Sequence, residues 1–529
     1  MKKINLIHGF ISTRKSHLRF LILLGVLSEF FALLIPISVG KFYELCLETT
    51  SLRAQVLNVL PFDFLNSIYS FLIYFSIIIS IRYLLGYQFR KSSRSFTELF
   101  IKFVKDQLFS HQLRISFEEY EKTGTSKYLL RYSGDINSLK NYFIKWIIES
   151  KVKIIVLFIG LFWLIYLNAI GGILFTILAI AFFIWLNVQN KLLEKISLQK
   201  RNYTSGQLSY VNRSLKAIKT IKSNVRENEV EHDYKKRTQK IYNKSVQFAE
   251  KDSLIRNTIS FFQYLVLVPI MLVFYNDVES GQFSGAVLVS FILLYLTILP
   301  VIRFVFRLPS VYKLGQISIS KLNKILRLPI DVVNENYGVY NNPRVVFKSF
   351  KIDGHSELNQ RCRKKNINTV SSSFTDFNFI QNIFHGLKEE SYKGSIEING
   401  IDIKSISHRT LRENVSILSS STVLIGRYVK DCFGSLSKSS RNALIQEKLN
   451  KLKKAFNLEF ELPPKRFIGE NGNLLSNYEY EILILAIALI QNKRIIILLD
   501  LPYLLKRNKT KLFEILKETN SSVLYFKNL

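Results

Sequence analysis

Residues 154–188 read IIVLFIGLFWLIYLNAIGGILFTILAIAFFIWLNV, without one charged side chain. A membrane-spanning helix needs about 20 apolar residues, so this stretch is long enough for two spans divided only by Asn168. We expect Asn168 to form nearly all of a very short loop. Two adjacent spans of this kind exclude a single soluble globule.

Four further stretches have a similar length and composition, and together they predict six membrane spans. The predicted spans are Leu18–Gly40, Phe64–Tyr87, Ile147–Leu167, Ala169–Val188, Thr258–Tyr275 and Val287–Phe306. The first follows basic residues, as the apolar part of a signal peptide does. Its apolar run is too long for that, no small-residue cleavage site follows, and further spans come after it. We expect it to be retained.

The charge distribution predicts the orientation. The chain has 529 residues and a formal net charge of +33. Basic residues crowd the N-terminus and two long loops, Arg90–Lys153 and Lys191–Arg256. By the positive-inside rule, both termini and both loops are expected on the cytoplasmic side of the cell (plasma or inner) membrane. No basic, aromatic-interleaved patch stands apart from these loops, so nucleic acid is not an expected partner.

Three cysteines, Cys46, Cys362 and Cys432, are widely separated along the chain. They exclude a disulfide scaffold and a cysteine-rich metal site. Both long loops show apolar residues at three- and four-residue spacing, which predicts helices. We therefore expect Tyr87–Tyr142 and Lys191–Asn257 to be long cytoplasmic helical hairpins. Their turns are expected near residues 116–123 and 222–227, in contact with the C-terminal domain.

This layout resembles the membrane domain of a type I ABC exporter half-transporter, which has six spans with long loops after the second and fourth. The segment Leu113–Ile136 resembles the family's first intracellular loop, a short transverse helix followed by a glycine. Leu215–Asn224 resembles the second loop, and Ser280–Phe291 is similar to the segment before the sixth span. The resemblance implies that the transverse helix docks on an ATPase domain.

After Pro329 short β-rich runs alternate with helical stretches, as in an α/β domain. Tyr392–Glu413 closely resembles the ABC ATPase segment in which a hairpin strand with Asn-Gly precedes a helix. The expected fold class is therefore an α-helical multi-pass membrane domain, residues 1–330, followed by a shortened, degenerate α/β P-loop NTPase-like domain, residues 331–529.

The resemblance also identifies where a phosphate loop, G-x-x-x-x-G-K-[ST], would lie. Such a loop binds phosphate through backbone N–H groups and a lysine, and its hydroxyl binds Mg²⁺. Counting back from Gly386 places Ser371–Asn378 there, with no glycine. Phe377 takes the lysine position and Asn378 the Ser/Thr position. Asp376 would repel phosphate by about 4 kcal/mol at roughly 4 Å and a surface-like dielectric.

The other family motifs are also altered. Ser420 stands where the family has a Gln that contacts Mg²⁺. Leu475–Glu479 replaces Leu-Ser-Gly-Gly-Gln, so both glycines are lost. Glu479 adds a negative charge that we expect to face a partner's ATP. The family's switch histidine falls near Asn528, and all seven histidines lie elsewhere.

Arg494–Pro502 resembles the family's buried strand that carries an Asp and then a catalytic Glu. Matching Pro502 places Asp500 on the Asp and Leu501 on the Glu, with one extra residue upstream. A gapless match places Asp500 on the Glu and Leu499 on the Asp. The carboxylate pair is broken in both alignments. We interpret Asp500 as a strand-end carboxylate that caps a neighbouring loop.

Charged residues also occur within the predicted spans, where they are costly. Glu29 lies in the first span, and Arg82 in the second is a candidate partner. A polar translocation cavity, a structural pair and an Arg82 that reaches the headgroups are the alternatives. Arg303 and Arg307 share one face at the end of the sixth span and are expected to extend to lipid headgroups.

These observations predict a membrane transporter subunit that moves an unknown substrate, as a homodimer or with a partner half-transporter. Its partners are the lipid bilayer and that second half. Its ATPase domain is expected to be catalytically silent: not an enzyme, with no catalytic, cofactor or metal site and without bound ATP or Mg²⁺. A non-transporting receptor or scaffold that kept the fold is the alternative, and a truncated, decaying gene product is a third hypothesis.

Overall fold

The computed structural model describes residues 6–47, 68–123, 128, 131–279, 285–330, 343–352, 357–363, 365–372, 377–387, 392–434 and 441–528. Its backbone packs into two compact units. The first comprises Met1–Leu113 and Thr123–Leu328, and the second comprises Arg114–Lys122 and Pro329–Leu529.

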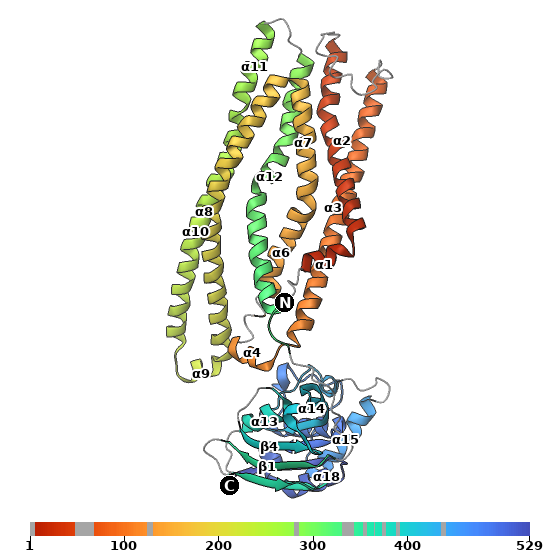
Figure 1. Cartoon of the computed structure of the whole chain (residues 1–529), viewed down its shortest axis with the longest axis vertical. Helices are drawn as coiled ribbons and strands as arrows, with labels where there is room; N and C mark the ends of the chain where they lie inside the picture. The colour runs from red at the N-terminus through yellow and green to blue at the C-terminus, as the bar shows by residue number, and fades with distance from the viewer. Residues whose placement is uncertain are drawn as a thin grey trace. The chain divides into compact units, whose positions relative to one another are not determined.

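The described part of the first unit is built of long helices and shorter helical segments (Figure 1). These are α1 (Leu6–Ser12), α2 (Lys15–Leu47), α3 (Ile68–Gln112), η3 (Arg131–Asp135), α6 (Ile136–Tyr142), η4 (Phe143–Glu149), α7 (Ser150–Leu167), α8 (Ala169–Lys216), α9 (Ile218–Ser223), α10 (Glu227–Leu265), α11 (Leu267–Glu279) and α12 (Gly285–Leu326). The turns η3 and η4 are π-helical and adjoin α6. Helices α2, α3, α7 and α12 pack together, and α8 packs along α10 (Figure 1).

Six helical stretches among the described residues are long and apolar enough to cross a membrane, which confirms the predicted number of spans. They are Lys15–Cys46, Ile68–Gln112, Ile136–Leu167, Ala169–Lys216, Glu227–Asp277 and Gly285–Leu326. Each contains one predicted span, except that the start of the second, Phe64, lies outside the described residues. Most of these helices continue well beyond the apolar run into polar sequence.

The loop between the third and fourth spans is a single residue, as predicted. Asn168 has extended backbone angles (φ −150°, ψ 109°), and its Oδ1 accepts a hydrogen bond of 2.9 Å from Gly171 N, which caps α8. Its Nδ2 donates to Asp277 Oδ2 at 2.9 Å. A Cβ on Gly172 would lie 2.6 Å from the Ile165 backbone, so the close approach of α7 and α8 requires glycine there.

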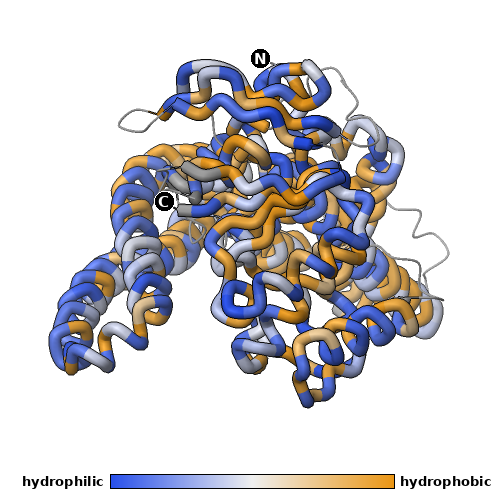
Figure 2. Tube along the Cα trace, turned by 90° about the horizontal axis from the view of Figure 1, so that it is seen from below, coloured by the Kyte–Doolittle hydropathy of each residue, from blue (hydrophilic) through white to orange (hydrophobic). Residues whose placement is uncertain are grey.

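The second long loop is the helical hairpin that the periodicity predicts. Helix α8 ends at Lys216, α9 follows, and α10 begins at Glu227, so the turn lies at the predicted position. Tyr210 Oη donates to Val230 O at 3.0 Å, and Gln207 Nε2 donates to Thr238 Oγ1 at 2.8 Å, which ties the two long helices together. The outer end of this pair is largely hydrophilic (Figure 2).

The first long loop contains the expected short helix, α4 (Phe117–Thr123). The backbone before α4 is joined to the chain that leaves α12. Ser116 N donates to Pro329 O at 3.1 Å, and Ile115 forms an antiparallel bridge with Ile330. These contacts explain why Arg114–Lys122 groups with the second unit.

The second unit is an α/β domain in which the described residues form two four-stranded sheets. The antiparallel sheet has the order β2 (Leu358–Arg361), β1 (Val345–Lys351), β4 (Lys393–Ile398) and β5 (Ile401–Asp402). The parallel sheet has the order β3 (Ile367–Ser372), β8 (Ser522–Asn528), β7 (Ile495–Leu498) and β6 (Val415–Leu418). The helices are α13 (Phe377–His385), η5 (Ile403–Ser405), α14 (His408–Asn414), η6 (Val429–Phe433), α15 (Arg441–Phe456), η7 (Glu470–Gly472), α16 (Asn477–Gln491), α17 (Tyr503–Arg507) and α18 (Lys509–Lys517).

Two sequence predictions for this unit are confirmed. The Asn399-Gly400 pair joins β4 to β5, with positive φ at both residues (55° and 83°), as the tight hairpin turn requires. Strand β7 is buried along its whole length, because parallel sheets carry helices on both faces. Helix α16 packs its apolar residues into the same core.

Candidate functional sites

The carboxyl ends of the four parallel strands lie at one edge of their sheet, where open α/β sheets bind ligands. Strand β3 ends at Ser372 and is followed by α13, so the segment at the phosphate-loop position lies between a strand and a helix, as in a P-loop. Residues 373–376 of this segment, and the side chains of residues 371–377, lie outside the described part.

Ser420 and Asp500 meet at this edge from the neighbouring strands β6 and β7. Ser420 Oγ donates to Asp500 Oδ2 at 2.5 Å, and Ser420 N donates to Asp500 O at 3.1 Å. The contact agrees with our interpretation of Asp500 as a strand-end carboxylate that caps a neighbouring loop. Its φ of 37° is unusual for a residue with a side chain. The next residue, Leu501, is buried.

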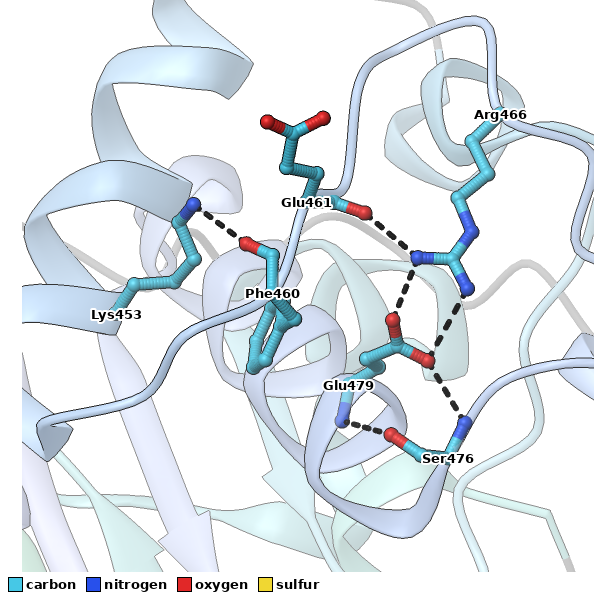
Figure 3. Close-up of polar contacts among 6 residues, drawn as sticks. All are labelled: Lys453, Phe460, Glu461, Arg466, Ser476 and Glu479. Carbon is cyan, nitrogen blue, oxygen red and sulfur yellow. Dashed lines mark hydrogen bonds and ion pairs between the residues drawn. The ribbon is translucent and has the colours of Figure 1, made fainter.

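The start of α16, which corresponds to the signature-like segment, is closed by its own side chains (Figure 3). Glu479 N donates to Ser476 Oγ at 3.3 Å, and Ser476 N donates to Glu479 Oε2 at 2.8 Å, so the two residues form a capping box. Arg466 donates through Nη1 to Glu479 Oε1 at 2.5 Å and through Nη2 to Oε2 at 3.3 Å. Arg466 Nη1 also donates to Glu461 O at 2.6 Å.

This geometry corrects the sequence prediction for Glu479. The side chain does not face outward but is only 9% exposed and points to Arg466 within the same domain (Figure 3). Burial alone raises the pKa of Glu479, but the Ser476 N–H and the Arg466 guanidinium hold that pKa below its ordinary value. The exposed residues at this helix start are Ser476, Asn477 and Tyr478. The spacing Ser-x-x-Glu is a sequence signal for the capping box.

The helix after the phosphate-loop position ends at His385, which is held in a cationic environment. Burial, together with the nearby positive charges of Lys493 and Arg412, lowers the pKa of His385 to about 4. Arg412 Nε donates to His385 O at 2.8 Å, and Lys493 Nζ donates to Arg412 O at 2.7 Å. His385 is therefore neutral near pH 7.

The charged residues of the spans pair differently from the prediction. Lys153 Nζ in the third span donates to Glu29 Oε1 at 2.7 Å, so Lys153 rather than Arg82 is the partner of Glu29. Arg82 lines the same cleft, of about 510 Å³. Arg82 forms no hydrogen bond or ion pair with any described residue. The sequence could not identify Lys153, because a pairing between distant helices depends on how they pack.

A second cleft, of about 550 Å³, contains Arg303 and Arg307. Arg307 Nη2 lies 3.3 Å from Asp252 Oδ1 on α10, so its guanidinium pairs across helices rather than serving only as a headgroup anchor. Within the described residues, no group of three or more His, Cys, Asp or Glu side chains is placed to hold a metal ion.

Comparison with known proteins identifies the family. The family model of the ABC transporter transmembrane region matches residues 18–300, more than half of the chain. The chain therefore belongs to this family of membrane transport proteins.

The fold comparison agrees with that assignment. The fold is similar to the solved "Structure of a bacterial Atm1-family ABC exporter with ATP bound", with a TM-score of 0.77 and 14% identity over 98% of this chain and 91% of that one. No curated protein matches the sequence. The chain is a multi-pass membrane protein with the fold of a type I ABC exporter half-transporter.

Proposed function

We propose that this chain is a transporter subunit whose own ATPase-like domain neither binds nor hydrolyses ATP. The observation that carries the proposal is the closed start of α16. The free N–H groups at a helix N-terminus bind anions such as phosphate. Here the Glu479 carboxylate already occupies that end of α16, and Arg466 neutralises it (Figure 3).

In type I exporters the signature segment of one subunit faces the ATP that the other subunit holds. Two glycines let the backbone approach that ATP, whereas this chain presents the exposed side chains of Asn477 and Tyr478. A phosphate would meet these side chains first and, behind them, a helix end that the Glu479 carboxylate already occupies. This arrangement supports the proposal that the signature segment contributes nothing to ATP binding.

The phosphate-loop and Mg²⁺-binding positions of the domain support the same proposal. The sequence 371–378 has no glycine and no lysine. Asp500, the acidic residue of the strand end, is bound to Ser420, the residue at the position of the Mg²⁺-contacting Gln. Because these two side chains are hydrogen-bonded to each other, they are not available as the oxygen ligands that ATP-bound Mg²⁺ needs.

The chain acts in the cell (plasma or inner) membrane with both termini cytoplasmic, as a homodimer or with a partner half-transporter. The two clefts among the membrane helices favour transport over the receptor or scaffold alternative, because a scaffold has no need of charged cavities within membrane spans or at their ends.

A nucleotide titration tests the proposal. The purified chain in nanodiscs is titrated with a fluorescent ATP analogue up to millimolar concentration, with and without Mg²⁺. We expect a linear, unsaturable signal that chelation of Mg²⁺ does not change. Saturable, Mg²⁺-dependent binding that unlabelled ATP displaces would refute the silent domain.

A further inference from the structure

The 550 Å³ cleft lies among η4, α8, α10 and α12, at the place where the apolar spans pass into the polar helical extensions. On α8 its first lining residue, Asn190, follows the end of the predicted fourth span by two residues. On α10 the lining residue Ile255 precedes the fifth span, and on α12 Arg303 is near the end of the sixth. The volume is within the range of small-molecule sites, about 300–1,000 Å³.

The cleft has an excess of positive charge. Its lining contains four basic residues and two acidic ones, which leaves an excess of two positive charges. Both carboxylates are already paired. Asp252 accepts hydrogen bonds from Arg256 Nε at 2.6 Å and Arg307 Nη2 at 3.3 Å, and Glu194 accepts one from Lys313 Nζ at 2.9 Å.

Arg303 and Lys145 differ from these residues. Each lines the cleft, has an exposed side chain, and forms no hydrogen bond or ion pair through that side chain with any described residue. A guanidinium presents five N–H donors and no acceptor. Near the edge of a bilayer such a group requires an anion or water, so the cleft contains an unused site for a negative charge.

The remaining walls are apolar. The lining includes the buried residues Leu193, Ile255 and Leu308 and the rings of Phe248 and Phe304. An apolar ligand body is thus accommodated beside the free guanidinium. A cationic ligand has no counter-ion here, because both carboxylates are engaged by basic side chains.

We propose that this cleft binds an anionic amphiphile, with its carboxylate or phosphate on Arg303 and its apolar body against Phe248 and Phe304. The inference deepens the proposed function, because it names the class of substrate that the transporter moves, and it rests on that function for its physiological role. Binding itself requires neither nucleotide nor transport.

Equilibrium binding in phosphatidylcholine nanodiscs tests this inference. Octyl phosphate is titrated into the full chain by calorimetry, and the heat from empty nanodiscs is subtracted. We expect Arg303→Gln to weaken binding at least about 10-fold, because a hydrogen bond to a charged group contributes about 1.5–3 kcal/mol. Arg303→Lys, which keeps the charge, should retain part of the affinity. Unchanged melting temperatures of both variants show that the fold is intact.

The matched control is Arg82→Gln, which removes an exposed arginine from the other cleft and should leave the affinity unchanged. Equal binding of octyl phosphate to the wild type and Arg303→Gln overturns the proposal, as does a loss confined to Arg82→Gln. Binding of inorganic phosphate or octyl glucoside as tight as that of octyl phosphate also overturns it, because both parts of the amphiphile are required.

The source of the ligand is distinguished by adding phosphatidic acid to the nanodiscs. If phosphatidic acid competes with octyl phosphate, the site is assigned to a bilayer lipid. If it does not compete, the site is assigned to a water-soluble amphiphile. In both cases the ligand is an anionic amphiphile. No nucleotide is present in this experiment, so a failure to bind octyl phosphate does not contradict the proposal of a silent ATPase domain. Conversely, ATP binding in the nucleotide titration would not contradict the proposed amphiphile site.

Discussion

Glu479→Gln measures how much the closed start of α16 contributes to the stability of the C-terminal domain. The change keeps the shape of the side chain but removes the charge that binds Arg466. Hydrogen bonds between charged groups contribute about 1.5–3 kcal/mol, and a carboxylate at a helix N-terminus contributes about 0.3–1 kcal/mol. Arg466 is one-third exposed, so solvent screening reduces the first figure. We expect a loss of about 2 kcal/mol.

Hydrogen exchange of the α16 amides is the appropriate assay, because all three tryptophans, Trp146, Trp163 and Trp185, lie in the membrane unit and do not report on this domain. A loss of about 2 kcal/mol predicts exchange about 30-fold faster at pH 7. Glu518→Gln is the matched control, since Glu518 pairs with Lys451 on the surface and should leave α16 unchanged. Exchange of α16 within threefold of wild type in Glu479→Gln would refute the reasoning.

Three further predictions concern other parts of the chain. Phe377→Lys should stay at background turnover, far below about 1 per second, because phosphoryl transfer needs positioning and charge together; a steady-state phosphate-release assay checks it. His385 has a pKa of about 4 against an ordinary 6.5, so the unfolded state takes up the proton first as pH falls. Between pH 7 and pH 4 the wild type should lose up to about 3 kcal/mol of domain stability, and His385→Gln should lose less. Hydrogen exchange, corrected for the pH dependence of the intrinsic exchange rate, measures both losses. Gln263 is 3% exposed, and neither amide atom has a hydrogen-bond partner among the described residues. Gln263→Leu should therefore stabilise the membrane unit by about 1–2 kcal/mol. Tryptophan fluorescence should show this as a higher melting temperature, and a lower melting temperature would contradict the absence of a partner.

The elements that the sequence predicts best are those with a local cause. Apolar runs predict the spans because a bilayer demands length and composition alone. The single-residue loop at Asn168 follows because that residue alone separates two such runs and can cap α8. The hairpin at Asn399-Gly400 follows from the positive φ that both residues tolerate.

The parts that the sequence does not predict depend on distant packing. Glu29 pairs with Lys153, 124 positions away, although Arg82 also lines its cleft. The Ser476–Glu479 capping box has a sequence signal, but Arg466 lies in a preceding loop whose path no local pattern defines. The clefts likewise arise only when η4, α8, α10 and α12 pack together.

These pairings bear on the hypothesis of a decaying gene product. A chain that loses its function without replacement accumulates buried charges that nothing compensates, and each costs several kcal/mol. Here Glu479 stands at an altered family position and is met by Arg466 and Ser476. Buried Glu481 accepts a hydrogen bond from Leu505 N at 3.1 Å. Glu479 and Glu481 therefore both have partners in the fold, which argues that the chain retains a stable C-terminal domain. A domain of that kind fits a subunit that transmits or regulates movement better than a relic.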